Sequence, residues 1–344
     1  MRHLELHIIQ SVPVSCLNRD DLGSPKTAYF GGVKRARVSS QSWKRAIREY
    51  AKEIAPELFQ GQRTKLLIEP LTVELEKKGI EDAGKVAHDF ANQLAKLDEK
   101  AIKAGKAQVK TLFFTSPLEL EKIAEEYSQC KDIKKSIKNN QWLDAADIAL
   151  FGRMVANDHS LTVEGASMFS HALSTHKADA EMDFYSAVDD RQPDEESGAG
   201  MMGTLEFQSA TYYRFAAVNL DMLSDNEHLG KLSLEQRQKI MEAFVEAVIK
   251  AVPAARKNSM NANTLPVCVL AIVREKGHPV QLVNAFENPV KGAGLASLSV
   301  QAMKKELESL KARWGLESEA EYELSADSTM TFAEFLAGVT GHVR

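Results

Sequence analysis

Strand-forming segments near the two ends of the chain are separated by a long polar block with a helical period. Residues 3–12 alternate in polarity, with Leu4 and Ile8 on one side, as a half-buried strand requires. Residues 60–140 are rich in Lys, Glu and Ala, and most of this block follows a helical period. A sheet built from both ends of the chain, with a helical region inserted, predicts an α+β fold.

The segments on either side of this block add further elements. Residues 27–38 are extended in pattern, and Ser39 or Ser40 can then cap a helix that runs to about Phe59. Residues 145–155 form an apolar run, which we interpret as a buried strand that returns to the first sheet.

The second half of the chain contains a long segment without a clear period, residues 156–206, which indicates a functional or irregular region. Residues 207–220 are then expected to form a strand, and residues 233–252 an amphipathic helix capped by its first serine. An apolar strand over 265–275, a Gly- and Ala-rich loop over 288–300 and two closing helices follow. This order favours a ferredoxin-like (RRM-like) sheet.

Composition excludes several classes of protein. No run of about 18 apolar residues could span a membrane, and the N-terminal residues lack the apolar block of a signal peptide. The three cysteines lie far apart and show no Cys-x-x-Cys spacing, so neither a disulfide framework nor a zinc site is expected. We therefore expect a cytoplasmic protein without membrane contact.

The charge of the chain is concentrated in one place. Residues 26–48 contain seven cations and no acid. Since the whole chain has a net charge of −5 and this segment contributes +7, the remainder is acidic at −12. A basic patch on an acidic body is typical of a localised polyanion site.

The predicted helix after Ser40 divides into two faces. At about 100° per residue its polar side chains fall within one arc, and Trp43 and Ile47 fall on the other side. Free backbone N–H groups and nearby serine hydroxyls at the helix start suit a phosphate, and arginine can bind phosphate through two donors. The alternative is an ordinary solvated helix face. The polar arc and the preceding strand supply Gln41, Lys44, Arg45 and Arg48, together with Lys34, Arg35 and Arg37.

These residues carry a resemblance to a known family. The stretch SCLNRDD over 15–21 and the stretch FGGVKRARVSSQSWKRAIR over 30–48 resemble the signature of the CasC family, the backbone subunits of the type I-E CRISPR surveillance complex, Cascade. Further similar motifs follow in order along the chain. They are Gly152-Arg153-Met154, residues 171–176, residues 186–190, Gly203-Thr204 with Glu206-Phe207, and residues 284–287.

The resemblance implies an architecture and partners. It implies an RRM-like palm made of residues 1–59 and 145–344, helical fingers over 60–144, and a thumb over 156–206. Copies of the chain would stack head to tail along CRISPR RNA and present the guide for pairing with a target DNA strand. Other Cascade subunits, namely the large, small, guide-end binding and guide-processing ones, would be further partners.

The resemblance also assigns roles to residues. Met154 would wedge against bases, and the thumb would offer a stacking aromatic at Tyr185, because stacking is indifferent to base identity. The alternatives are that Met154 belongs to the core, that Tyr185 and Phe184 form a small satellite core, and that Arg153 is a buried partner of an acid. Guide-backbone contacts would come from Arg19, Lys26, Ser39, Gln41, Lys44, Arg45 and Arg48, with Lys291 as a weaker one; Phe184, Tyr185, Ser186 and Met202 would belong to the thumb.

The sequence departs from the family pattern at two places. Val33 stands at a position that is often basic, and Asp194, Glu195 and Glu196 make the thumb acidic. These acids argue against direct RNA contact by the tip of the thumb.

Catalysis is not expected. No phosphate-binding loop, dinucleotide fingerprint or metalloprotease motif is present, and His171 and His176 would fall on opposite faces of a strand. We therefore expect no metal and no cofactor. The alternatives are a metal-dependent ribonuclease subunit that uses Asp189 and Asp190, and a free-standing RRM-like RNA regulator, which would lack the aromatic motif of such domains.

Overall fold

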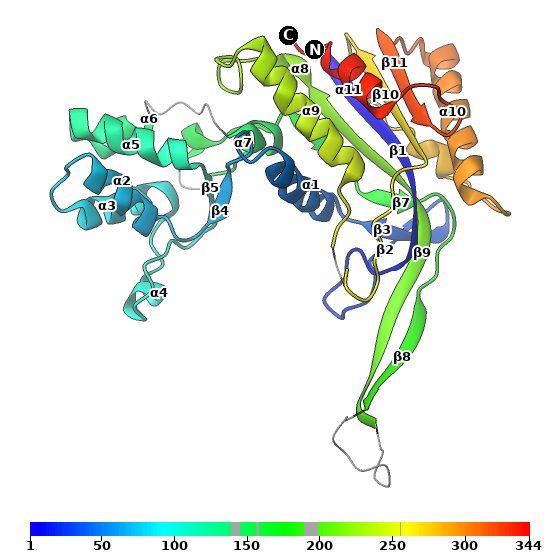
Figure 1. Cartoon of the computed structure of the whole chain (residues 1–344), viewed down its shortest axis with the longest axis horizontal. Helices are drawn as coiled ribbons and strands as arrows, with labels where there is room; N and C mark the ends of the chain where they lie inside the picture. The colour runs from blue at the N-terminus through cyan, green and yellow to red at the C-terminus, as the bar shows by residue number, and fades with distance from the viewer. Residues whose placement is uncertain (139–144, 156–157, 189–198, 255) are drawn as a thin grey trace.

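The computed structural model describes residues 1–138, 145–155, 158–188, 199–254 and 256–344. It confirms an α+β fold with an antiparallel sheet in the order β11-β10-β1-β9-β7-β3-β2, and β6 and β8 also pair with β9 (Figure 1). The strands of this sheet are β1 (His3–Ser15), β2 (Thr27–Phe30), β3 (Val33–Val38), β6 (Ser167–Phe169), β7 (Ala172–Ser174), β8 (Glu181–Val188), β9 (Ala199–Asn219), β10 (Cys268–Arg274) and β11 (Ala320–Ser325).

Helices cover both faces of this sheet (Figure 1). Helix α1 (Ser40–Ile54) and helix α9 (Leu234–Lys250) pack on one face through a core that includes Leu6 and Phe244. Helix α10 (Leu295–Trp314) packs on the other face. The sheet is therefore buried on both sides, and the prediction of a half-buried first strand is wrong in this respect because α10 covers its second face.

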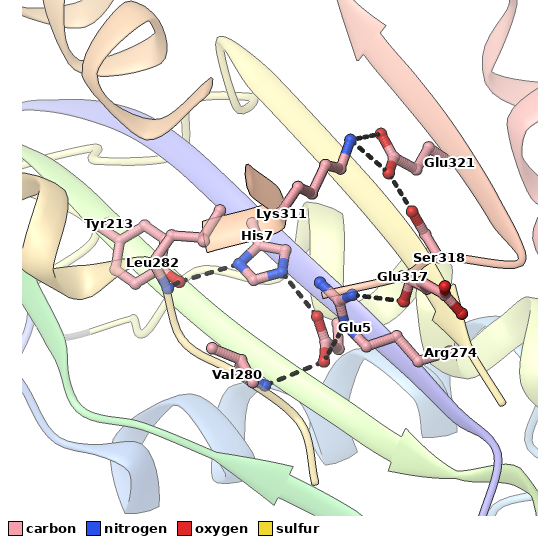
Figure 2. Close-up of polar contacts among 10 residues, drawn as sticks. All are labelled: Glu5, His7, Tyr213, Arg274, Val280, Leu282, Lys311, Glu317, Ser318 and Glu321. Carbon is pink, nitrogen blue, oxygen red and sulfur yellow. Dashed lines mark hydrogen bonds and ion pairs between the residues drawn. The ribbon is translucent and has the colours of Figure 1, made fainter. Parts of the chain in front are cut away.

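Burial of that second face encloses a polar network, drawn in Figure 2. Glu5 Oε1 accepts from Arg274 Nε at 2.9 Å, and Glu5 Oε2 lies 3.3 Å from His7 Nε2. His7 Nδ1 lies 3.0 Å from the Tyr213 hydroxyl, which accepts from the Leu282 N–H at 2.8 Å. The network joins β1, β9 and β10 to the loop that follows β10.

The protonation states in this network follow from burial. Burial lowers the pKa of His7, and the interaction with Glu5 only partly opposes it. Burial acts to raise the pKa of Glu5, but the hydrogen bond from His7 and the charge of Arg274 outweigh it and lower that pKa. A neutral His7 that donates from Nε2 to a charged Glu5 satisfies both groups.

A predicted strand and the predicted end of a helix differ from the structure. The run over 145–155 is not a strand but a buried helix, α7 (Ala146–Phe151), and a short apolar run does not separate the two by its period. Helix α1 ends at Ile54, before the predicted Phe59, because Pro56 disfavours helical backbone at the residue before it, Ala55. Helix α9 starts at its serine cap as predicted.

The polar block forms a helical region with its own apolar core, which Figure 1 shows beside the sheet, beyond α7. A two-stranded sheet, absent from the sequence prediction, lies between this region and helices α1 and α7 (Figure 1). The elements are β4 (Gln62–Thr64), α2 (Ile68–Lys77), α3 (Ala83–Ala95), α4 (Glu99–Lys103), β5 (Phe113–Thr115), α5 (Pro117–Cys130) and α6 (Ile133–Lys138).

The segment 156–206 is more regular than expected. It includes a 3-10 turn, η1 (His159–Leu161), two short strands of the main sheet and β8, which pairs with the first part of β9. Figure 1 shows this β8–β9 hairpin projecting away from the rest of the molecule. The remaining elements are α8 (Leu220–Leu223), η3 (Val283–Phe286) and α11 (Phe332–Thr340). Strand β11, between the two closing helices, was not predicted.

None of the helices in the described ranges is both long enough and apolar enough to cross a membrane.

Candidate nucleic-acid interface

The start of α1 is fixed by its serine cap, as predicted. The Ser39 hydroxyl accepts from the Ser42 N–H at 3.3 Å, and the Ser39 N–H donates to Asn18 Oδ1 at 3.0 Å. Ser39 is buried, so its hydroxyl serves the helix itself. At the next position the Ser40 N–H donates to His171 Nδ1 at 3.2 Å.

The histidines of the motif at 171–176 flank β7 and serve different parts of the backbone. Burial lowers the pKa of His171, and the charges of Arg37 and Lys26 lower it further, so this ring accepts from the start of α1 as a neutral group. His176 Nε2 accepts from the Thr211 N–H at 3.1 Å. Each histidine has its own structural partner.

The outer face of α1 is organised as the sequence predicts. Trp43 and Ile47 are buried, Gln41 and Arg45 are exposed, and Lys44 and Arg48 are partly exposed. We call Gln41, Lys44, Arg45 and Arg48 the basic face. Arg45 also pairs with Glu49 at 2.8 Å, but this pair is solvent-exposed and therefore weak.

A groove borders the basic face and mixes both signs of charge. Arg19 and Arg45 line it together with Asp20, Asp21 and Glu49. Lys26, just before β2, and Lys34, in β3, do not line this groove, and both are partly exposed.

Arg35 does not reach this surface, so the prediction that it binds RNA conflicts with its position. Its side chain is fully buried and donates only to backbone carbonyls. Nε donates to Phe30 O at 3.1 Å and Nη1 to Ser174 O at 3.1 Å. Nη2 donates to Phe286 O at 2.7 Å and to Glu287 O at 3.2 Å. Arg35 therefore fixes the β2–β3 hairpin against distant segments.

The segment that leads to Lys291 packs against the same hairpin. Gly31, in the β2–β3 turn, has φ of +59°, and a Cβ there would lie 1.7 Å from Glu287 O. Glycine is therefore required where the turn meets the segment that leads to Lys291. Lys291 itself is exposed.

Met154 and Arg153 have opposite environments. Met154 is 82% exposed, so the alternative that it belongs to the core is wrong. Arg153 is buried and pairs with Glu119 at 2.9 Å, which confirms the alternative of a buried partner for an acid.

The β8–β9 hairpin carries apolar side chains in solvent. The register pairs Phe184 with Thr204, Ser186 with Met202 and Met182 with Glu206, which places the members of these pairs on one face. Met182, Phe184 and Met202 are 72%, 76% and 71% exposed, and Ser186 is exposed as well. The sequence prediction did not include Met182, although its two-residue spacing from Phe184 indicates that both lie on the same face of a strand.

Tyr185 lies on the other face of this hairpin, opposite Gly203. A Cβ at Gly203 would lie 2.4 Å from the Tyr185 hydroxyl, so the ring packs across the glycine. Because Phe184 and Tyr185 point to opposite faces, they do not form a satellite core together.

Five acidic residues of the segment 156–206 lie outside the described residues. These are Asp189 and Asp190 of the ribonuclease alternative, and Asp194, Glu195 and Glu196. Within the described ranges, no group of three or more His, Cys, Asp or Glu side chains could hold a metal ion.

The geometry defines an α+β protein with a cationic helix face and a projecting apolar hairpin. A family described as CT1975-like protein matches residues 4–339, so the chain belongs to this family. No curated protein matches it.

Two solved structures are similar over nearly the whole length of both chains. The first, titled "CRISPR RNA-guided surveillance complex, pre-nicking", is 28% identical, covers 99% of both chains and has a TM-score of 0.79. The second, titled "CRISPR RNA-guided surveillance complex", is 25% identical, covers 99% of this chain and 98% of the other, and has a TM-score of 0.64.

These findings confirm the expected similarity to subunits of CRISPR surveillance complexes. The assignment to the CasC family and to type I-E stays a prediction.

Proposed function

We propose that this chain is a non-catalytic backbone subunit of a CRISPR surveillance complex, of the CasC type, and that it coats single-stranded guide RNA. The observation that carries the proposal is the basic face of α1, in a chain similar to a surveillance-complex chain over 99% of its length. Lys and Arg side chains at regular helical spacing suit successive phosphates of a strand, whatever its sequence.

The order of the central strands supports an RRM-like palm. The order β10-β1-β9 continues to β6 and β7, every neighbouring pair is antiparallel, and α9 connects β9 to β10 on the same face as α1. This order supports a ferredoxin-like arrangement of the palm. The helical region then corresponds to the fingers and the β8–β9 hairpin to the thumb.

The exposed apolar face of the β8–β9 hairpin supports assembly with further copies. Met182, Phe184 and Met202 are exposed on a thin projection, a position that a lone protein rarely gives to three large apolar side chains. A neighbouring copy with its RNA would cover them, and the bases left exposed would pair with a target DNA strand. Other subunits of the complex would bind at the ends and along the row.

Binding of unstructured single-stranded RNAs of increasing length tests this proposal. We expect the bound mass to rise in steps of one chain as the RNA lengthens, with little sequence preference and a strong salt dependence. One chain per RNA at every length would favour the free-standing regulator. RNA cleavage that requires divalent metal and is abolished by Asp189→Ala would establish the ribonuclease.

A further inference from the structure

A cluster of cations lies where α1 meets the helical region, and only part of it belongs to the basic face. Arg48 lies with its guanidinium carbon 4.7 Å from the centroid of the Phe114 ring in β5. Arg63 in β4 lies 4.7 Å from the same centroid, so the two guanidinium groups are separated by at most twice that distance. Lys44 stands one helical turn before Arg48, with its Nζ 5.4 Å from the centroid of Phe169.

Among the residues that the structure describes, one carboxylate forms an ion pair with this cluster. Asp147 Oδ2 lies 3.6 Å from Arg48 Nε, and Asp147 Oδ1 accepts from the Gly61 N–H at 3.1 Å. Asp147 is buried, so its charge is committed to Arg48 and to the backbone. Three cations against one carboxylate leave the cluster positive.

The positive charges are close enough to repel each other. Burial lowers the pKa of Lys44, and the charge of Arg63 lowers it further. Arg63 is exposed as a residue, but partial desolvation of its guanidinium also lowers its pKa, and the charge of Arg48 adds to this effect. An anion placed among the three side chains would relieve this repulsion.

Arg63 has the geometry of a free phosphate ligand. It is exposed, and within the part of the chain that the structure describes its side chain makes no hydrogen bond or ion pair. Stacking on Phe114 uses the face of the guanidinium and leaves the in-plane N–H donors available. Arginine in this state can bind a phosphate through two donors.

We propose that Arg63, together with Lys44 and Arg48, binds a backbone phosphate of single-stranded RNA at this junction, so that the helical region contributes directly to RNA binding. The inference rests on the proposed RNA-binding function and adds a residue outside α1 and its preceding strand.

Fluorescence anisotropy with a labelled single-stranded RNA tests the inference on the full chain. We expect Arg63→Ala to weaken binding on the order of tenfold and to reduce the salt slope by about 0.7, the value for one phosphate of a single strand. Arg63→Lys keeps the charge but loses the planar fork, so it should recover only part of the affinity. The matched control is Lys103→Ala, an exposed cation of α4, which should change binding less than about twofold.

The outcomes separate this inference from the proposed function. If the wild type binds RNA and Arg63→Ala binds equally well with an unchanged salt slope, the junction site is wrong and the proposed function stands. If the wild type binds no RNA, both the junction site and the proposed function are wrong. The unfolding midpoints of the variants show whether each one is folded. If Arg63→Lys restored the full affinity that Arg63→Ala loses, binding of the phosphate through two donors would be contradicted.

Discussion

Cations on the two sides of the sheet have different partners. On α10, Lys304 pairs with Glu323 at 2.7 Å, and Lys311 pairs with Glu308 at 2.9 Å and with Glu321 at 2.8 Å. On the α1 side, Lys44, Arg48 and Arg63 instead lie against the rings of Phe169 and Phe114, with one acid among them.

The difference indicates which charges are available to a partner. A carboxylate cancels the charge of the lysine that it pairs with, whereas an aromatic ring holds a cation in place without neutralising it. Lys44, Arg48 and Arg63 therefore keep positive charge available to a polyanion, whereas Lys304 and Lys311 do not. A third kind of cation, Arg35, is enclosed and serves the fold alone.

Removing the enclosed cation should have the largest effect on stability. Arg35→Ala leaves backbone carbonyls without their donors, and we expect a loss of roughly 3 kcal/mol in the free energy of unfolding. The partly exposed neighbour Arg37, whose Nε donates to Thr27 O at 3.2 Å, is the control, and Arg37→Ala should cost less than about 1 kcal/mol. Urea unfolding measures both, and equal losses would remove the distinction between them.

Removing the cations that lie over aromatic rings should have the largest effect on RNA binding. We expect Lys44→Ala/Arg48→Ala to weaken single-stranded RNA binding on the order of 100-fold, equally for all sequences. Because Arg48→Ala would leave the buried Asp147 carboxylate without its cation, the substitution is made in an Asp147→Asn background. The Asp147→Asn variant is measured alone as well.

The α10 lysines are the control for this comparison. Lys304→Ala/Lys311→Ala removes the same number of cations but should change RNA affinity less than about twofold, because those charges are already neutralised. A loss comparable to that of Lys44→Ala/Arg48→Ala would mean that net charge alone governs binding.

Substitutions on the exposed face of the β8–β9 hairpin should affect the assembly of copies but not the stability of the chain. Met182→Ser/Phe184→Ser should change the free energy of unfolding by less than about 0.5 kcal/mol, because both side chains are exposed. The same variant should weaken the assembly of several copies on a long RNA about tenfold while leaving single-copy binding to a short RNA intact. Sedimentation velocity on the two RNAs distinguishes these states, and unchanged assembly would exclude the hairpin as a contact between copies.

Acidification should cause the smallest effect. The pKa values of His3, His7, His171 and His176 all lie below the ordinary 6.5, with burial the largest cause in each case. The unfolded chain therefore binds more protons than the native chain as the pH falls through 6.5, and stability declines. The raised pKa of Asp147 acts in the opposite sense but comes from one group. We expect the free energy of unfolding, measured in urea, to fall by about 1 kcal/mol between pH 7 and pH 5. An increase over this range would contradict the prediction.

Local chemistry made part of this structure predictable from sequence. The serine cap and the two faces of α1 follow from residues within a few positions of each other, and both were predicted. The exposure of Phe184 and Met202 also agrees with the roles that the family resemblance gave them.

What depended on distant partners could not be predicted. Arg35 looks like its basic neighbours in the sequence, but its acceptor Phe286 O lies 251 positions away. Arg63 carried no signal, because its stacking partner, Phe114, comes from another strand of the helical region. The strand predicted over 145–155 failed because an apolar run shows burial and not the kind of element.

The most direct test of the account is the mass and ultraviolet absorbance ratio of the protein purified after co-expression with a CRISPR RNA and the other subunits of its complex. We expect particles that contain several copies of this chain and nuclease-protected guide RNA, and we expect Lys44→Ala/Arg48→Ala in the Asp147→Asn background to abolish them. A monomer free of nucleic acid, with or without the guide, would contradict it.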